Sequence, residues 1–224
     1  MKNNSTNPSE DLQAIRDIME RSSRFLSLSG LSGIFAGICA LIGVAIGWFV
    51  ILDSGYAKYE EQMPVTGSAI CQNIDLCLVI DALLVLGSAL FGAVYFSNRK
   101  ARKAGRQLWN KQTRRVLIHL MIPLAAGGLF ILILMFRNHL DMIVPAMLVF
   151  YGLALVNAGK FTFGEIHYLG LTEIVLGILA GIFINYGILL WSIGFGLMHI
   201  VYGTVMYFRY EREGLRAQGV GRRA

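Results

Sequence analysis

An all-α membrane protein with six transmembrane helices is the fold class that the sequence predicts, and three observations predict it. Hydrophobic residues make up 55% of the 224-residue chain and charged residues only 15%, which is too apolar for a water-soluble domain of this length. The apolar residues fall into six runs, each close to the roughly 20 residues that a helix needs to cross the hydrocarbon. Lys and Arg gather between and after these runs, as they do in cytoplasmic loops.

The chain divides into three segments. Residues 1–9 are polar and lack a hydrophobic run, so we expect no cleaved secretory signal at the start. Residues 1–25 as a whole are expected to be a cytoplasmic lead-in with a short amphipathic helix. Residues 26–209 are the transmembrane domain, and residues 210–224 are a basic cytoplasmic tail. The six spans are expected at about 26–51, 76–97, 116–136, 140–158, 166–185 and 188–208.

The basic residues also predict the orientation. The connection between the second and third spans, residues 98–115, is rich in Lys and Arg and has no acid, and the C-terminal tail holds further Arg. By the positive-inside rule both segments lie in the cytoplasm, which puts both termini inside and the acidic first loop, residues 52–75, outside. We expect a multi-pass protein of the bacterial inner membrane whose basic segments contact anionic headgroups and not nucleic acid.

Two cysteines of the outer loop, Cys71 and Cys77, would lie on the side where thiols are oxidised. A disulfide between them would hold the start of the second span. Five intervening residues do not fix the Cα separation that a disulfide requires, so two free thiols remain an open alternative. Cys39, in the middle of the first span, is interpreted as a small packing residue.

Internal similarity predicts three helical-hairpin repeats. A constant offset aligns the first span with the fifth, pairing Gly30-Leu31-Ser32 with Gly170-Leu171-Thr172. Each even span carries an aromatic–glycine pair at a similar distance from its cytoplasmic end. Because all odd spans run in the same direction, the repeats would be parallel and related by an axis along the membrane normal.

Glycines mark the positions where helices are expected to approach each other closely. On the first span, two glycines form the small-xxx-small motif that brings helix backbones together. The aromatic–glycine pairs add one glycine on each even span. The predicted helix-packing positions are Gly33, Gly37, Gly92, Gly152 and Gly203.

The last two spans resemble a known hairpin. The fifth contains Gly-Leu-Thr-Glu173-Ile-Val-Leu-Gly-Ile, and the sixth contains Gly194-Phe-Gly-Leu-Met-His-Ile-Val-Tyr-Gly203 and ends in Arg. This pattern resembles the hairpin repeat of HdeD-type acid-resistance membrane proteins, best over residues 165–209. The resemblance implies a six-helix bacterial inner-membrane protein with a stress-linked role, and it supplies no catalytic residue. The chain departs from the family pattern at Asn185-Tyr186-Gly187, where the family tends to have a proline turn, and in its acidic first loop.

Glu173 and His199 are the candidate functional residues. Both lie deep in apolar spans at comparable depth, so their side chains can meet. A titratable group at membrane depth indicates a functional site by default. The pair could bind and release a proton, or it could be a buried hydrogen bond with Glu173 protonated that fixes how two helices pack. The structural interpretation is preferred, because packing alone explains an isolated polar pair.

No enzyme is predicted, because no catalytic motif is found. We expect neither a cofactor nor a metal site, although His119 and His167 lie at similar depths and leave open a haem held by two histidines. The preferred function is passing or sensing a small solute or proton within the bundle. The alternative is a non-transporting structural or signalling membrane subunit that contacts a cytoplasmic partner. Association with further copies of the chain is a second open point.

Overall fold

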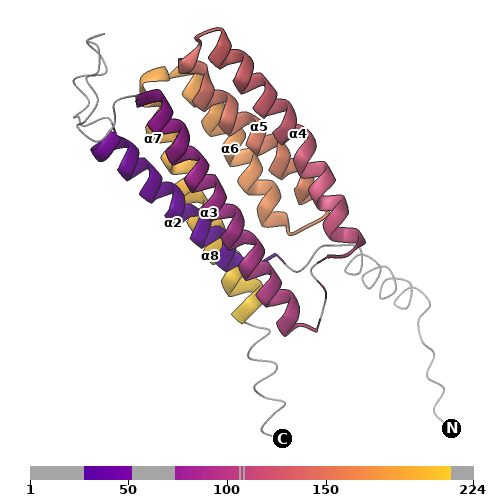
Figure 1. Ribbon diagram of the computed structural model, residues 1–224. Helices are drawn as coiled ribbons and strands as arrows, with labels where there is room; N and C mark the ends of the chain where they lie inside the picture. The colour runs from indigo at the N-terminus through magenta and orange to yellow at the C-terminus, as the bar shows by residue number, and fades with distance from the viewer. Residues whose placement is uncertain (1–27, 52–73, 106, 108, 213–224) are drawn as a thin grey trace, which may run out of the picture.

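The computed structural model describes residues 28–51, 74–105, 107 and 109–212, and every regular element within them is a helix (Figure 1). Six helices are long and apolar enough to cross a membrane. The all-α fold with six candidate spans is therefore confirmed. The predicted lead-in at residues 1–25, the outer loop with Cys71 and the tail beyond residue 212 lie outside the described residues.

The first five spans are nearly continuous helices. The last span is divided into five consecutive helical segments, of which two are π-helical. The bounds are α2 Gly30–Ile46 with η1 Gly47–Ile51, α3 Ile74–Lys103, α4 Lys111–Phe136, η3 Leu140–Met142 with α5 Ile143–Gly159, α6 Gly164–Ile182, and for the last span η4 Ile184–Tyr186, α7 Gly187–Trp191, η5 Ser192–Met198, α8 His199–Met206 and η6 Tyr207–Arg212.

The second helix, α3, is longer than the span predicted at 76–97. It continues through the basic residues to Lys103 and ends before Gly105, whose φ of 64° is the left-handed conformation that terminates helices. Falling hydropathy marks where a helix leaves the hydrocarbon, not where it ends. Lys and Arg are good helix formers, and at a helix C-terminus they interact favourably with the helix dipole.

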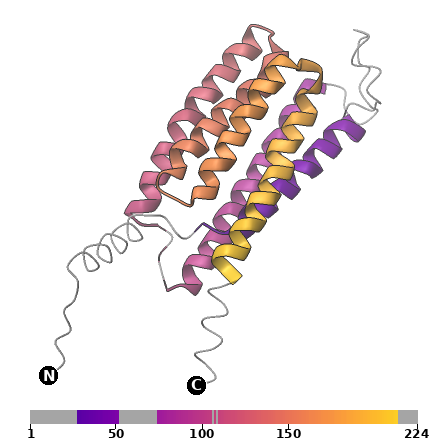
Figure 2. The ribbon, with the colours of Figure 1, turned by 180° about the vertical axis from the view of Figure 1, so that it is seen from behind.

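The helices pack in an order that differs from their order in the chain. The sequence of neighbours is α3, α2, last span, α6, α5, α4, with the largest contact between α5 and α6. Figure 2 shows α6 and the last span side by side, with α2 beyond them. Although α3 and α4 are consecutive in the chain, they make little contact and form the two ends of this series.

Two glycine crossings bring helix backbones into direct contact. In one, Gly30 of α2 faces Gly203 of α8; in the other, Gly152 of α5 faces Gly170 of α6. A Cβ built at Gly203 would lie 2.7 Å from the Gly30 carbonyl oxygen, and one built at Gly170 would lie 2.7 Å from that of Gly152. Only glycine permits such an approach, because any side chain would meet backbone atoms of the facing helix.

The other predicted packing glycines also face neighbouring helices. A Cβ at Gly33 would lie 3.2 Å from the His199 carbonyl oxygen, and one at Gly37 would lie 2.6 Å from that of Gly196. Gly92 of α3 lies against the ring of Phe35. All five predicted positions thus lie at helix contacts.

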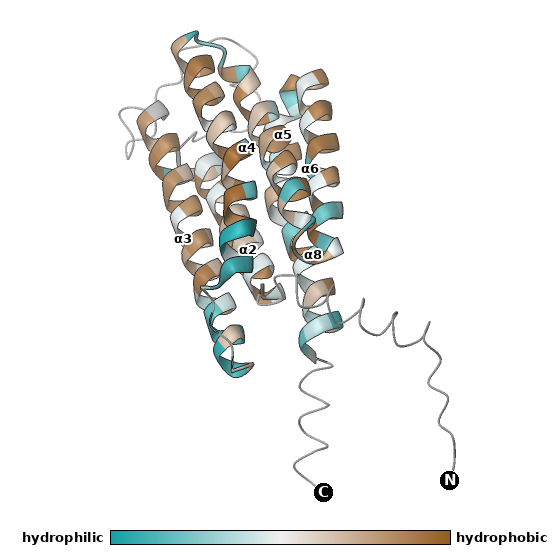
Figure 3. Ribbon diagram, turned by 90° about the vertical axis from the view of Figure 1, so that its right-hand side faces the viewer, coloured by the Kyte–Doolittle hydropathy of each residue, from teal (hydrophilic) through white to brown (hydrophobic). Residues whose placement is uncertain are grey.

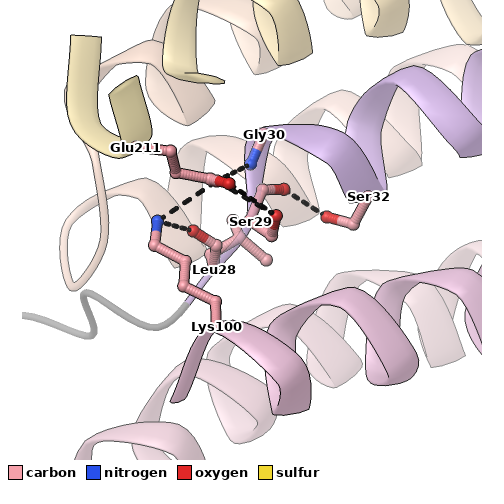
Figure 4. A network of polar contacts seen from close by, with 6 residues as sticks. All are labelled: Leu28, Ser29, Gly30, Ser32, Lys100 and Glu211. Carbon is pink, nitrogen blue, oxygen red and sulfur yellow. Dashed lines mark hydrogen bonds and ion pairs between the residues drawn. The ribbon is translucent and has the colours of Figure 1, made fainter. Parts of the chain in front are cut away.

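One end of the bundle is polar, and we call it the basic end: here α3 ends, α4 begins and the last span ends. Figure 3 shows hydrophilic residues at the ends of α3 and the last span and hydrophobic residues along most of the helices. Glu211 accepts a hydrogen bond from the first backbone N–H of α2, at Gly30 (2.7 Å), and lies 3.4 Å from the Lys100 ammonium (Figure 4). The carboxylate thereby caps α2 and ties it to α3 and the last span.

Candidate functional site

The site forms where α5, α6 and the last span meet, and its centre is the carboxyl group of Glu173. Glu173 lies in the middle of α6 and is 0% exposed. Neither of its oxygens has a hydrogen-bond partner. A Cβ added at Gly194 would collide with Oε2 and come within 2.9 Å of Leu148, so glycine at 194 leaves room for the carboxyl group among apolar atoms.

His199 of α8 lies beside this carboxyl group and is itself buried. Its Nδ1 is 3.5 Å from Glu173 Oε1 and 2.9 Å from the carbonyl oxygen of Gly194. Its Nε2 is 2.8 Å from the hydroxyl of Tyr151 on α5. The structure therefore brings the two predicted residues together, although the direct bonds of the imidazole go to Gly194 and Tyr151.

These contacts define the tautomer of a neutral His199. A backbone carbonyl can only accept a hydrogen bond, so Nδ1 carries the proton and donates to Gly194. Nε2 is then the acceptor, and the Tyr151 hydroxyl donates to it. The Nδ1 proton satisfies the Gly194 carbonyl, which leaves the Glu173 carboxyl close to the imidazole but without a donor of its own.

The π-helical segment η5 supplies the Gly194 carbonyl. In α-helical geometry that carbonyl would accept from the backbone N–H of residue 198. The wider turn of η5, Ser192–Met198, precedes His199 directly, and the His199 side chain reaches back five residues to this oxygen. Single π-turns inside α-helices are frequent at functional sites. Here the distortion positions the imidazole at the carboxyl group.

Aromatic rings enclose the imidazole on its other sides. The Phe195 ring is nearly parallel to it, at 9° and a centroid distance of 5.8 Å, and the Tyr151 ring lies at 5.5 Å. The Trp191 ring in turn contacts the Phe195 ring, at 4.9 Å and an interplanar angle of 30°. Within the described residues, the imidazole is therefore surrounded by aromatic rings and bonds to one carbonyl and one hydroxyl.

A second buried glutamate on the same helix, in contrast to Glu173, has hydrogen-bond donors for its carboxylate. Glu165, in the first turn of α6, is 7% exposed. It accepts a hydrogen bond from Arg209 at 2.8 Å and one from the Tyr210 hydroxyl, whose oxygen is 3.1 Å from each of the two carboxylate oxygens. It also lies at a helix N-terminus, where negative charge is stabilised. Glu173 has none of these partners.

Tyr151 is the member of the site that the sequence did not assign. In the sequence it is the aromatic half of the pair Tyr151-Gly152, one of the aromatic–glycine pairs of the even spans. Its equivalent in the last span, Tyr202, makes a 3.4 Å contact with the Thr172 hydroxyl. A signal was present: Tyr151 has a hydroxyl at membrane depth, where polar groups need a partner.

The other candidate residues are placed as follows. The two histidines left open for a haem have other ring neighbours. The His119 ring packs on Phe161 at 4.6 Å, and the His167 ring contacts Tyr168 at 6.0 Å. Among the described residues, no group of three or more His, Cys, Asp or Glu side chains could hold a metal ion. Cys77 is disulfide-bonded and Cys39 is free; Cys71, the predicted partner of Cys77, is not among the described residues.

Comparison with known proteins gives no match: no family model matches the sequence, and no curated protein or solved structure matches the chain. The chemistry of the site therefore rests on its own geometry.

The tautomer is directly testable. In ¹⁵N-labelled protein we expect His199 Nδ1 to show the shift of a protonated nitrogen and Nε2 that of a hydrogen-bonded acceptor, because Gly194 and Tyr151 fix these roles. A His199→Gln variant assigns the signals. Tyr151→Phe removes the donor at Nε2 and is expected to move that nitrogen alone. Nδ1 as the bare nitrogen in wild-type protein would contradict the assignment.

Proposed function

We propose that this chain is an integral inner-membrane protein that takes up and releases a proton at Glu173, next to His199 and Tyr151, and thereby senses or passes protons within its helix bundle. One observation carries the proposal. The carboxyl group of Glu173 is 0% exposed, has no hydrogen-bond donor and lies 3.5 Å from an imidazole.

The electrostatics of the arrangement support proton binding. Burying an ionised carboxylate without a hydrogen-bond donor in apolar surroundings costs on the order of several kcal/mol. In the observed geometry the carboxyl group therefore holds its proton. The neighbouring imidazole offers a second group that can take up a proton. Its acceptor nitrogen, Nε2, faces Tyr151 and not Glu173, so a proton that Glu173 releases does not pass to it directly. If the Tyr151 hydroxyl turns away, Nε2 takes up a proton from outside the pair, and Nδ1–H then faces a Glu173 carboxylate that has released its own.

The topology belongs to the proposal as well. The exposed Lys and Arg residues at the end of α3 and the start of α4 support a cytoplasmic basic end, and with six spans both termini lie on that side. A stress-linked role, which the hairpin resemblance implies, fits a site that responds to protons.

Three parallel hairpin repeats also remain part of the proposal, and the two glycine crossings support it. Aligned residues of the first and fifth spans, Gly30 and Gly170, meet aligned residues of the even spans, Gly203 and Gly152. In a three-repeat arrangement, the contact equivalent to these two crossings would join α3 and α4, and the described residues show no glycine crossing there. In this scheme Glu173 takes the place of Gly33, so the carboxyl group belongs to one repeat only.

The competing function is a structural or signalling subunit that moves no proton. Its support is the complete burial of Glu173, since a buried polar group can serve packing alone.

Proton flux into proteoliposomes that contain a pH-sensitive dye separates these functions. For a conducting protein we expect wild type to exceed empty vesicles and Glu173→Gln to fall to the empty-vesicle level, because the amide cannot exchange the proton. Asp141→Asn, which changes an exposed acid outside the site, is the control and should match wild type.

Infrared difference spectra recorded across a pH step test sensing without flux. Wild type is expected to show a protonated-carboxyl band that Glu173→Gln removes and Asp141→Asn leaves intact. If wild-type flux equals that of empty vesicles and no such band appears, the protein neither conducts nor senses protons at Glu173, and the structural or signalling function is supported.

A further inference from the structure

A group of exposed cations lies at the basic end, outside the site around Glu173. It is contributed by the last turns of α3 and the first turns of α4, which are joined by the short connection 104–110. The members are Arg99, Arg102, Lys103, Lys111 and Arg114. None of them forms an ion pair with another described residue.

The described acids at the same end are already engaged. Glu165 is bonded to Arg209 and Tyr210, and Glu211 to Lys100 and the N-terminus of α2. Two further cations at this end lie over aromatic rings, Lys100 over Phe163 at 5.2 Å and Arg115 over Phe161 at 5.5 Å. The five exposed cations therefore present positive charge that the described part of the chain does not balance.

Apolar side chains continue from these cations along both helices toward the middle of the membrane. On α3 they are Leu90, Phe91, Val94 and Tyr95, and on α4 they are Leu117, Ile118, Met121 and Ile122, all exposed. The two helices make little contact with each other. Gly87 and Gly128, in the middle of the two helices, have nothing within 4 Å of an added Cβ. The exposed cations match the charged headgroup of an anionic phospholipid, and the exposed apolar side chains next to them along the helices match its acyl chains.

We propose that the end of α3 and the start of α4, which the connection 104–110 joins, bind an anionic phospholipid, with its phosphate on the exposed cations and its acyl chains along the apolar faces of the two helices. Charge complementarity identifies the headgroup, since each Lys or Arg near an anionic lipid surface attracts it appreciably. The exposed apolar turns directly beneath distinguish a lipid from a soluble phosphate, which would use the cations alone. Arg side chains also favour phosphate through paired N–H donors.

Native mass spectrometry of protein taken from bilayers of equal phosphatidylglycerol and phosphatidylcholine tests the site. Wild type is expected to retain phosphatidylglycerol in preference to phosphatidylcholine. Arg114→Gln should reduce that preference about fivefold, and Arg102→Gln with Arg114→Gln should reduce it further. Arg137→Gln is the matched control, because Arg137 is exposed at the opposite end of the same helix. Circular dichroism and elution volume establish that each variant is folded.

Several outcomes would overturn the proposal. Equal retention of the two lipids by wild type would show that these cations are covered in another way, and equal effects of Arg114→Gln and Arg137→Gln would show that the attraction is not local. Displacement of the lipid by inorganic phosphate alone would show that the acyl chains contribute nothing. A nucleic acid or an acidic protein that co-purifies through the same cations, in place of lipid, would make these helix ends a binding site for that macromolecule.

Discussion

Replacement of Gly203 by valine is expected to lower the free energy of unfolding by about 3 kcal/mol or more, the upper part of the range for overpacked positions. A Cβ at this position would lie 2.7 Å from both the Gly30 carbonyl oxygen and the Ile34 backbone nitrogen. Backbone atoms of a packed helix cannot move aside as the end of a flexible side chain can. The whole contact between α2 and α8 must therefore open. Unfolding in increasing dodecyl sulfate, followed by circular dichroism, measures the loss.

Gly128→Val is the matched control. Gly128 lies in the middle of α4, and nothing comes within 4 Å of an added Cβ there. We expect this variant to stay within about 0.5 kcal/mol of wild type, as is usual for exposed positions. Equal destabilisation by the two substitutions would mean that loss of glycine within a helix, and not the crossing, determines stability.

The sequence was sufficient for the spans, because a helix must satisfy its own backbone in lipid and therefore appears as a long apolar run. It was also sufficient for the depth of Glu173 and His199, since depth follows from counting residues along a helix. The contact between these two residues, at 3.5 Å, joins neighbouring helices of one hairpin, which the short turn at Asn185 already brings together.

The order of the helices in the bundle could not be predicted in the same way. A lipid-facing side chain is as apolar as one that faces another helix, so hydropathy does not show which helices touch. Nothing in the α3 sequence shows that it contacts α2 and makes little contact with α4. The bonds of His199 to Gly194 and Tyr151 depend on the π-helical turn of η5, whose backbone has no signature that we could read in the residues.

Glu173→Lys is expected to have the largest effect of any single substitution in the site. It would place a positive charge where the carboxyl group now lies 0% exposed, beside Leu148, Gly194 and His199. None of these neighbours is an anion, and a charge buried without a partner destabilises by about 4 kcal/mol. We expect the variant to fail to fold, or to unfold at much lower dodecyl sulfate than wild type.

Glu173→Gln distinguishes the two charge states of the site. If Glu173 holds its proton, as the missing donors indicate, a neutral amide replaces a neutral acid of the same shape and stability changes by about 1 kcal/mol or less. If the carboxylate is instead ionised and paired with a protonated His199, the same substitution leaves an imidazolium without its counter-ion and costs about 3 kcal/mol or more. In that second case His199→Gln would be equally costly, and the double variant would regain much of the loss. If Glu173→Gln leaves the stability nearly unchanged and Glu173→Lys prevents folding or lowers the stability strongly, the carboxyl group is one that its surroundings keep protonated.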